Sequence, residues 1–459
     1  MLNPTMSQER QLSAADISAR LERLPITRRL SVTRLIIGAA TFFDAYTVLA
    51  IAFAMPVLVR EWKLTPAEVG MILSFGYLGQ LIGAIFFGWL AERIGRLRVL
   101  LLTIVVFVAM DIACLFAWSA TSMIVCRFLQ GIGTGGEVPV ASAYVNELIG
   151  SRRRGRFFLL YEVIFPIGLM FAGIVGTFFV PTYGWKAMFI VGLVPAVLMI
   201  PLRWFMSESP RWLASKGRLG EADAIVAELE RAAQAEGKPL APPVAVTVQA
   251  GGRRDSNWRE LFQGIYRRRT LTIWALWFCV YMVANGLVTW LPTLYREVFK
   301  LPLQTSLAYG FTTSACGVVA SIVCAFLIDK VGRKRWYISA FLLGMLPLLV
   351  LAWLGADAPT HVLVLATTAY AIVQTIAFSL YLYSAELYPT RLRALGTGCG
   401  SGWLRLGSSA GPFVIGVVVT DSGIGTVFAV FAGVLAVGAL VTALFAIETA
   451  GQPLETLSP

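Results

Sequence analysis

Long apolar segments recur along the whole chain, and they constrain its fold more than any other feature of the sequence. The 459 residues are 57% hydrophobic and only 14% charged, which does not suit a soluble protein. A hydrocarbon core about 30 Å thick is crossed by a helix of roughly 20 residues. Apolar runs of that length predict an all-α membrane protein with twelve transmembrane helices, at residues 35–59, 68–91, 98–118, 121–147, 157–181, 186–206, 270–297, 305–329, 335–356, 360–387, 394–420 and 424–447.

The predicted helices form two sets of six, separated by a polar stretch. Within that stretch, residues 219–235 predict a helix that braces the two halves, followed by a linker rich in Ala, Pro and Gly. No signal peptide is evident in the first 30 residues. We expect a cytoplasmic N-terminal segment, a first six-helix half, a cytoplasmic loop with short helices, a second six-helix half and a cytoplasmic tail, at residues 1–34, 35–206, 207–269, 270–447 and 448–459.

The excess of basic residues follows the topology of the predicted helices. The net charge is +12, and Lys and Arg cluster in alternate loops, such as 93–98, 152–156 and 330–335, while the loops between them carry few. By the positive-inside rule these clusters are cytoplasmic, so both termini are cytoplasmic and the number of spans is even. We expect a multi-pass protein of the cell inner (plasma) membrane, embedded in the lipid bilayer, with no nucleic-acid partner.

Two motifs at the predicted cytoplasmic boundaries occur twice. Residues 92–98 return as residues 329–335, at an offset of 237. Tyr144, Glu147, Leu148 and Arg152 return as Tyr383, Glu386, Leu387 and Arg391, at an offset of 239. Two matches at nearly one offset indicate a duplicated six-helix unit. Such a plan places a binding site between the halves near mid-membrane, reached from either side as the halves rock.

Three motifs resemble those of the major facilitator superfamily of transporters, and the resemblance covers nearly the whole chain. Residues 88–96 are similar to its loop signature after the second helix, with Glu92 where Asp is more usual. Residues 207–218 resemble the sugar-porter and organic-ion-transporter signature after the sixth helix, and residues 448–455 their terminal signature, except at Ala450. The resemblance implies the major facilitator fold and alternating access, and it extends to bacterial niacin and aromatic-acid proton symporters.

Five ionisable residues lie inside predicted spans, where a charge at mid-bilayer costs at least about 2.5 to 3.5 kcal/mol. They are Asp44, Asp111, Arg127, Glu137 and Arg405. Asp44 lies about 15 Å into the first span and Arg127 about 9 Å into the fourth from its external end, so the two can pair. Proton-coupled sugar porters, which the chain resembles, have an aspartate and an arginine at these motif positions, which implies proton coupling through Asp44 and Arg127. The alternatives are a static ion pair and a pairing of Arg127 with Asp111.

Glu137 follows glycines at positions 131, 133, 135 and 136. Small residues let another helix approach closely, so we expect these glycines to serve helix packing. A carboxylate in a glycine-lined crevice needs a partner or a proton. The Gly-Gly-Glu run resembles that of metabolite-proton symporters, which implies a substrate-gating or second proton role for Glu137.

Arg405 carries the expectation about the cargo. It lies near mid-membrane, about 18 Å along the eleventh span, and no acidic residue lies at a matching depth in the second half. A guanidinium without a fixed counter-charge suits an anionic ligand and binds a carboxylate bidentately. Residues 398–408 resemble the eleventh helix of organic ion transporters, where anion carriers tend to have a basic residue. A pairing of Arg405 with Glu162 or Glu137 is the alternative.

Aromatic and amide side chains on the first, seventh, tenth and eleventh spans complete the predicted substrate site. With Arg405, the aromatic rings would form a slot that ends in a cation, although each ring singly suits lipid contact or packing. The amides could orient a ring nitrogen or hydroxyl group. Sugar is a weaker expectation, because residues 281–285 lack the paired-glutamine motif of sugar porters. The candidates are Tyr46, Tyr281, Trp290, Tyr370, Phe378, Tyr381, Trp403, Asn285 and Gln374.

Charged residues at the predicted cytoplasmic boundaries have a separate role. Acids recur among the bases in both copies of the repeat, which favours ion pairs over topogenic charge alone. In the superfamily that the chain resembles, such clusters are latches between helices that hold the outward-open state. The predicted cytoplasmic latch consists of Gly88, Glu92, Arg93, Gly95, Arg96, Glu147, Arg152, Asp329, Gly332, Arg333, Glu386 and Arg391.

The sequence therefore predicts a proton-coupled secondary transporter that imports a small organic anion, with an aromatic carboxylate such as nicotinate or a benzoate as the favoured cargo. The alternatives are a sugar carrier, a multidrug or organic-cation carrier, and a transporter-like receptor without flux. A membrane enzyme is disfavoured, because the sequence shows no nucleophile paired with a base and no set of metal ligands. We expect a monomer without cofactor or metal.

Overall fold

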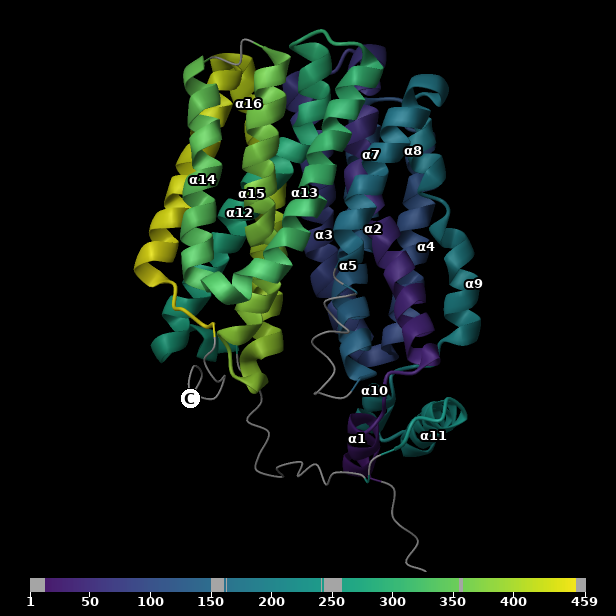
Figure 1. Cartoon of the computed structure of the whole chain (residues 1–459). Coiled ribbons are helices and arrows are strands. Elements are labelled where there is room, and N and C mark those ends of the chain that lie inside the picture. Colours follow the sequence, from purple (N-terminus) through teal and green to yellow (C-terminus); the bar gives the residue numbers. More distant parts are fainter. Residues whose placement is uncertain are drawn as a thin grey trace, which may run out of the picture.

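The computed structural model of the chain describes residues 13–149, 161, 163–240, 242, 258–354 and 358–450. Within these residues all regular structure is helical, and two bundles of long helices stand next to each other (Figure 1). The first bundle contains α2 (Arg28–Trp62), α3 (Pro66–Ile94), α4 (Arg96–Leu115), α5 (Ala120–Glu147), α7 (Ile164–Tyr183), α8 (Lys186–Val191) and α9 (Pro195–Phe205). The second contains α12 (Gly264–Glu297), α13 (Leu303–Val331), α14 (Arg333–Leu354), α15 (Pro359–Glu386) and α16 (Thr390–Phe445).

Ten helical segments among the described residues are long and apolar enough to cross a membrane. The all-α membrane fold is thereby confirmed. α5 has 28 residues, but it includes Arg127, Glu137 and several glycines, and it is not among the ten. Twelve crossings therefore stay a prediction, and so do the sides of the membrane on which the termini lie.

The sixth predicted span, residues 186–206, is wrong as a single helix. α8 ends at Val191 and α9 begins at Pro195, with turns between them. Proline lacks the N–H that continues a helix and suits the first helical position, so it favours a new start here. The last two predicted spans share α16, which is interrupted at Gly423, where φ is 75°. Glycine adopts this left-handed backbone without a steric penalty, so one residue suffices to separate them.

Glycines set the distance between the helices that carry the buried charges. A Cβ on Gly131 of α5 would collide with the carbonyl oxygen of Gly76 on α3, and a Cβ on Gly135 would collide with that of Gln80. The packing interpretation of this glycine run is confirmed. α16 approaches α12 similarly, because a Cβ on Gly411 would collide with the Met282 carbonyl oxygen. Arg127, Glu137 and Arg405 are thus carried by closely packed helix pairs.

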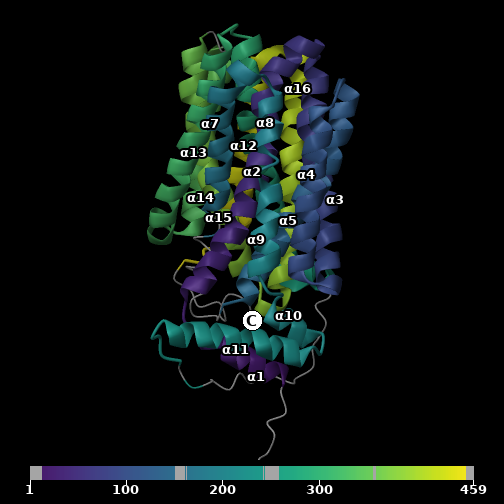
Figure 2. The same cartoon turned by 90° about the vertical axis from the view of Figure 1, so that its right-hand side faces the viewer.

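Three short helices lie at one end of the molecule, which we call the loop end (Figures 1 and 2). They are α1 (Ala14–Glu22), α10 (Pro210–Ser215) and α11 (Leu219–Ala235). The bounds of α11 confirm the helix predicted at 219–235. The expectation that this helix braces both halves is wrong, since it packs mainly on α1 and α10. The later part of the polar stretch, η1 (Trp258–Phe262), packs on α12 instead.

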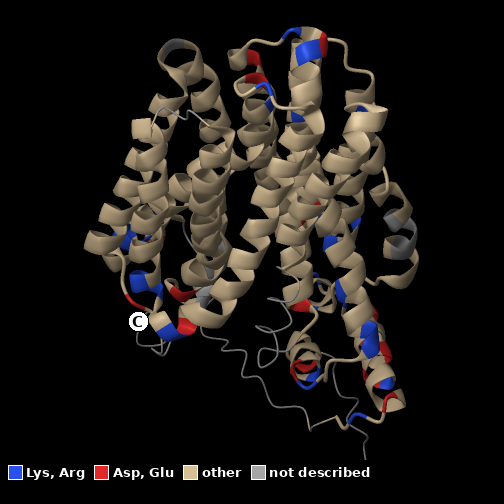
Figure 3. Cartoon of the chain, turned by 45° about the horizontal axis from the view of Figure 1, so that its top comes forward, with Lys and Arg blue, Asp and Glu red and all other residues tan. Residues whose placement is uncertain are grey.

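Ion pairs fasten α1 to α11. Arg20 and Arg23 each bind Glu230, with N–O distances of 2.7 and 2.6 Å, and Arg20 also binds Asp223. Partial burial opposes ionisation of Glu230, but the hydrogen bonds from Arg20 and Arg23 hold the pKa of that carboxyl below its usual range. Figure 3 shows that most charged residues lie toward the two ends of the molecule, as topogenic charge requires.

The two bundles meet at mid-length and at the end opposite the loop end, which we call the far end. There the Ser74 hydroxyl donates to the Ser409 carbonyl oxygen at 2.8 Å. Arg60 forms a salt bridge of 3.0 Å with Glu297. Toward the loop end the ribbons of the two bundles diverge (Figure 1). The contacts between the bundles that would position a site therefore lie between mid-length and the far end of the molecule.

Candidate functional site

Asp44 and Arg405 interact across the two bundles. Asp44 lies on α2 and is 3% exposed, while Arg405 lies on α16 and is 5% exposed. The two side chains interact electrostatically, yet the salt bridges of the described residues do not include this pair. Asp44 also makes no hydrogen bond to another described side chain, and its Oδ1 atom is buried. Two buried opposite charges thus attract each other without direct contact. This arrangement leaves Arg405 able to bind another anion and Asp44 able to bind a proton.

The Arg405 guanidinium is held by two carbonyl oxygens. It donates to Ser401 in its own helix at 3.0 Å and to Gly135 of α5 at 3.1 Å. Its Nε atom has no hydrogen-bond partner among the described residues. Carbonyl groups carry only partial charge, so the cation keeps its capacity to bind a carboxylate with charge-assisted hydrogen bonds. The predicted alternative partner Glu162 lies outside the described residues.

An aromatic cluster adjoins this cation. Arg405 interacts electrostatically with Tyr381 on α15 and Tyr281 on α12. Trp277 stacks on Tyr281 with ring centroids 5.4 Å apart and meets Tyr381 edge-on at 4.6 Å. The sequence reasoning did not include Trp277. Its position four residues before Tyr281 was the available signal, because such residues share a helix face.

Asn285 continues the same face of α12, one turn beyond Tyr281. Its amide Nδ2 donates to the Ser408 hydroxyl at 2.6 Å, and that hydroxyl donates to the Leu404 carbonyl oxygen at 2.8 Å. Ser408 is three residues beyond Arg405 in α16. The amide oxygen of Asn285 accepts no hydrogen bond from the described residues, so it is the group left to meet a ligand donor.

Three other predicted site residues make contacts within the protein, and their part in the site stays a prediction. Tyr46 is buried in the first bundle, where its hydroxyl donates to the Met188 carbonyl oxygen at 2.7 Å. Trp290 donates to the Pro412 carbonyl oxygen at 3.0 Å, toward the far end. Trp403 stacks on Trp274 with centroids 5.3 Å apart.

The three remaining predicted residues lie on α15 with Tyr381. Gln374 and Phe378 are half-buried, and their spacing of four residues, with three more to Tyr381, places them on one helix face. Tyr370 is buried one turn before Gln374. Their part in the site stays a prediction.

The expected pairing of Asp44 with Arg127 is wrong for this structure. Arg127 on α5 donates to the side-chain oxygen of Gln130, and the amide nitrogen of Gln130 donates to Asp111 on α4. Arg127 also interacts electrostatically with Asp111. The depth of a residue along its helix predicted that the pair could form, but the direction of the side chain around the helix axis decided which acid it meets.

Glu137 is fully buried beside α2. Its carboxylate accepts a hydrogen bond of 2.9 Å from the Thr41 hydroxyl, which lies 2.7 Å from the Tyr161 hydroxyl. Thr41 is three residues before Asp44 on one face of α2, so this group sits one turn toward the loop end from Asp44. The gating or proton role of Glu137 stays a prediction.

Residues of the predicted latch form two equivalent ion-pair clusters, one in each bundle, while their role as a latch stays a prediction. Arg96 binds Glu92 at 2.6 Å and Glu147 at 2.9 Å. In the second bundle, Arg333 binds Asp329 and Glu386 at 2.6 and 3.0 Å. Helix α4 begins after Gly95 and α14 after Gly332, both with positive φ. A Cβ on Gly88 would meet no described atom within 4 Å, and Arg93 lies over the Trp89 ring. Arg152 and the Arg391 side chain lie outside the described residues.

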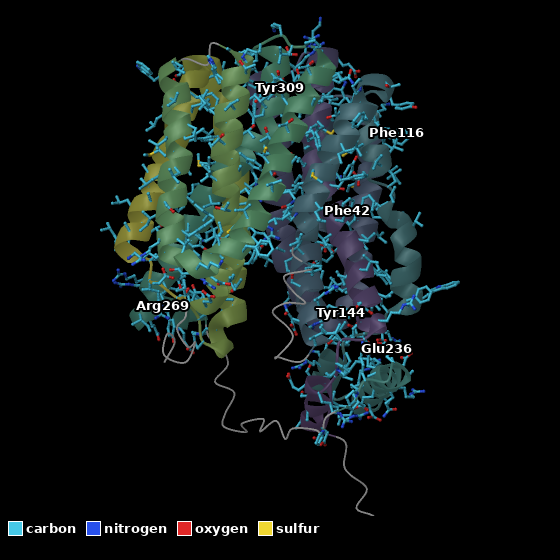
Figure 4. All side chains as sticks on the ribbon, viewed as in Figure 1. Phe42, Phe116, Tyr144, Glu236, Arg269 and Tyr309 are labelled. Atoms are coloured by element: carbon cyan, nitrogen blue, oxygen red, sulfur yellow. The ribbon has the colours of Figure 1, made fainter. Side chains whose placement is uncertain are left out.

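Two glutamates that the sequence reasoning did not single out anchor these clusters. Glu208 accepts hydrogen bonds from the backbone N–H groups of Arg96 and Leu97, and Glu448 from those of Arg333 and Lys334. Carboxylates at helix N-termini satisfy unpaired N–H groups and complement the helix dipole. Nearby, the Tyr144 hydroxyl donates to the Ser207 carbonyl oxygen at the loop end of the first bundle (Figure 4). The offset of 240 residues between the two glutamates, close to that of the other repeats, was the available signal.

Removing one of these anchors should lower stability. Glu448→Ala leaves the N–H groups at the start of α14 without their acceptor, so we expect a lower apparent Tm, corresponding to about 1 kcal/mol. Burial opposes ionisation of Glu448, but backbone N–H groups hold its pKa below the usual range. This contribution is therefore present at neutral pH and lost as the pH falls through the lowered pKa. Thermal unfolding in detergent at several pH values tests this, with the exposed Glu221→Ala as the control; equal Tm values at neutral pH would contradict it.

A groove of about 660 Å³ lies elsewhere, between α13, α14 and α15. It is lined by apolar residues that include Val319, Val323 and Leu343, which are exposed on the outer face of the second bundle. None of the predicted substrate residues lines it. In a membrane this face meets acyl chains, so the groove is not the candidate site.

Comparison with known proteins gives consistent matches over most of the chain. The family described as sugar (and other) transporter matches residues 30–459. The niacin transporter NiaP of Acinetobacter baylyi is 33% identical over 451 residues, which cover 96% of this chain and 99% of that protein. The benzoate transport protein of the same organism is 28% identical over 82% of this chain and 80% of that protein. The inward-open xylose transporter XylE of E. coli has the same fold, with a TM-score of 0.71 at 17% identity, over 93% of this chain and 99% of that one.

Proposed function

Because the chain belongs to the sugar (and other) transporter family of the major facilitator superfamily, we propose that it imports a small aromatic carboxylate, such as nicotinate or a benzoate, together with protons. The relatives named for niacin and benzoate transport support this class of cargo. The loop end, which carries the basic clusters, is then cytoplasmic. The protein works by alternating access, with the two bundles rocking around a site between them.

One observation carries the choice of cargo. Arg405 is buried between the bundles, forms no salt bridge with the residues that the structure describes, and lies next to the rings of Tyr281 and Tyr381. A buried cation requires an anion for compensation, and a guanidinium binds a carboxylate with two parallel hydrogen bonds. The neighbouring aromatic rings suit a planar ring attached to that carboxylate. A sugar carries no charge with which to bind Arg405 directly or to displace Asp44 from it.

The relation of Asp44 to Arg405 suggests how protons are coupled to the cargo. An incoming carboxylate competes with Asp44 for the same cation. Once displaced, Asp44 would be an uncompensated charge in a buried position, so it takes up a proton instead. Loaded with one anion and one proton, the carrier has the same net charge as the empty form. This favours the rocking of the bundles that moves the cargo across the membrane.

In the proposed mechanism, the salt bridge between Arg60 and Glu297 helps to close the site on its periplasmic side. It joins α2 of the first bundle to α12 of the second at the far end. Both side chains are partly exposed, so the pair contributes at most about 1 kcal/mol, or roughly fivefold in an equilibrium. In this arrangement the carrier is closed to the periplasm and faces the cytoplasm.

Reversing one charge of this pair should slow transport. Arg60→Glu places two carboxylates opposite each other and disfavours the closed far end, so we expect the uptake rate at saturating substrate to fall up to about fivefold. The exchanged pair, Arg60→Glu with Glu297→Arg, should recover most of that rate. Lys63→Glu serves as the matched control, because Lys63 makes no ion pair among the described residues. A double variant no faster than Arg60→Glu would contradict the gate.

Binding and flux of defined compounds test the proposed function. The purified protein is screened by thermal shift with nicotinate, benzoate and 4-hydroxybenzoate, and with nicotinamide and xylose as uncharged comparisons. A ligand at 100 times its Kd stabilises a protein by about 2.7 kcal/mol, so carboxylates should raise the Tm and uncharged compounds should not. Radiolabelled ligands are then supplied to proteoliposomes under an imposed pH gradient. Stabilisation by xylose alone would favour a sugar carrier, and binding without accumulation would favour a receptor.

A further inference from the structure

Arg127 is a second buried cation, and its surroundings contain few groups that could compensate its charge. It is 5% exposed. Among the described residues, its guanidinium donates to Gln130 and otherwise only to the carbonyl oxygens of Thr47 and Val48, at 3.3 and 3.4 Å. These oxygens belong to α2 and carry partial charge. A guanidinium that is removed from water needs a full counter-charge nearby.

Asp111 supplies such a charge without contacting Arg127 directly, because Gln130 lies between them. It is 1% exposed on α4, and its Oδ1 atom accepts a hydrogen bond from Nε2 of Gln130. The other end of the same amide, Oε1, accepts from Arg127. A flipped amide would present N–H groups to the cation and oxygen to the anion, so the charges on both sides fix its orientation. Gln130 therefore acts as an oriented dipole between cation and anion.

Glycines and a few polar groups surround this cluster. A Cβ on Gly192, after α8, would lie 2.9 Å from Oδ2 of Asp111, and one on Gly76 would lie 3.1 Å from the Arg127 guanidinium. The titratable neighbours are Tyr77 of α3, Tyr46 of α2, Cys114 of α4 and Cys126 of α5. No other carboxylate interacts with Arg127 among the described residues.

The cluster lies next to the residue that binds protons in the proposed mechanism. Thr47 and Val48, whose carbonyl oxygens accept from Arg127, are one turn beyond Asp44 on α2. Arg127 is thus about one helical turn from Asp44, roughly 5 Å along the axis. Asp44 nevertheless interacts with Arg405 and not with Arg127.

We propose that Asp111 is a positioning residue that holds Arg127 through Gln130 and so leaves Asp44 to Arg405. Without the negative charge of Asp111, Arg127 turns to Asp44, about one helical turn away along α2, and keeps that carboxylate ionised. Asp44 then cannot exchange protons, and Arg405 is released for the substrate. The effect on transport rests on the proposed function. The arrangement of Arg127, Gln130 and Asp111, which we call the charge relay, does not depend on it.

The test relocates the charge within the relay. Asp111→Asn removes it, Asp111→Glu keeps it, and the double variant Asp111→Asn with Gln130→Glu returns a carboxylate in direct reach of Arg127. Asp223→Asn, at a surface ion pair of α11, is the matched control. Each protein is measured in three ways: Tm without substrate, proton-driven accumulation in proteoliposomes, and substrate counterflow without a proton gradient.

For Asp111→Asn we expect a lower Tm and a loss of accumulation of about tenfold, within the range of coupling between two sites. Counterflow should continue, and its half-saturating concentration should fall because Arg405 no longer holds Asp44. A merely structural role of Asp111 would not lower accumulation while leaving counterflow intact. Asp111→Glu and the double variant should recover both Tm and accumulation, while Asp223→Asn should resemble wild type.

Two results would overturn the proposal. One is an Asp111→Asn variant with wild-type Tm and accumulation. The other is a loss of Tm, accumulation and counterflow together that the double variant does not repair, which would make Asp111 a folding residue. Because the Tm comparison uses no substrate, the relay is tested even if no carboxylate is transported, and that failure would then concern the proposed function alone.

Discussion

Arg405→Ala should abolish carboxylate uptake. The variant removes the buried cation that interacts with Asp44 and is held by the Gly135 carbonyl oxygen. Loss of one partner of a buried, charge-assisted pair costs about 2 to 5 kcal/mol, so we expect kcat/KM to fall by at least about thirtyfold. Initial uptake of radiolabelled nicotinate or benzoate into proteoliposomes measures the effect. The thermal shift with the same ligand should vanish in parallel.

The controls separate a lost binding site from a damaged fold. Arg405→Lys keeps the charge but not the planar pair of donors, so it should retain an intermediate rate. Arg405→Ala also leaves Asp44 buried without a counter-charge, and the Tm of each variant without ligand shows whether the bundle survives. A folded Arg405→Ala variant that takes up carboxylates within twofold of wild type would exclude the proposed binding role.

Asp44→Asn should uncouple the cargo from protons. In one-to-one symport of a monovalent anion with a proton, an imposed difference of two pH units supports about hundredfold accumulation, since each unit corresponds to about 1.4 kcal/mol. The asparagine cannot take up a proton, so accumulation should fall to a concentration ratio near one. Counterflow should persist, because exchange of substrate needs no net movement of protons.

The same variant should bind substrate more tightly. Asp44 competes with the cargo for Arg405 in the proposed mechanism, and asparagine removes this competing charge. The half-saturating concentration in counterflow should therefore be lower than in wild type, opposite to the effect of Arg405→Ala. Glu22→Gln, which affects a salt bridge at the loop end, is the matched control. Undiminished proton influx and accumulation in Asp44→Asn would end the proton-coupling hypothesis.

Sequence reasoning predicted several elements of the fold correctly. The helix at 219–235 coincides with α11, and the charges of residues 92–98 and 329–335 form equivalent clusters in the two bundles. Apolar runs, repeats and helix bounds are local properties of the chain, so they can be recognised without knowing the tertiary contacts. The sixth span was wrong only as a single helix, because Pro195 lies in an apolar run whose hydropathy hides the break between α8 and α9.

The candidate site was predicted in part. Arg405 and Asp44 were recognised from the cost of burying charge, yet the partner assigned to Asp44 was Arg127. Trp277 was missed, since an aromatic residue in an apolar span does not stand out from its neighbours. Tyr46 was included although its hydroxyl binds the Met188 carbonyl oxygen inside the first bundle.

The sequence by itself indicated that this protein is a duplicated helical membrane transporter and which of its charges lie far from the ends of the apolar segments, where burying a charge is costly. Depth follows from position along a helix at 1.5 Å per residue, so the sequence contains it. Only the tertiary structure decided which charges meet, because that depends on helix rotation, on the close approach at Gly131 and Gly135, and on the direction of long side chains. Those packing contacts turned Arg127 toward Gln130 and Asp111, and they left Asp44 to Arg405 on the opposite bundle.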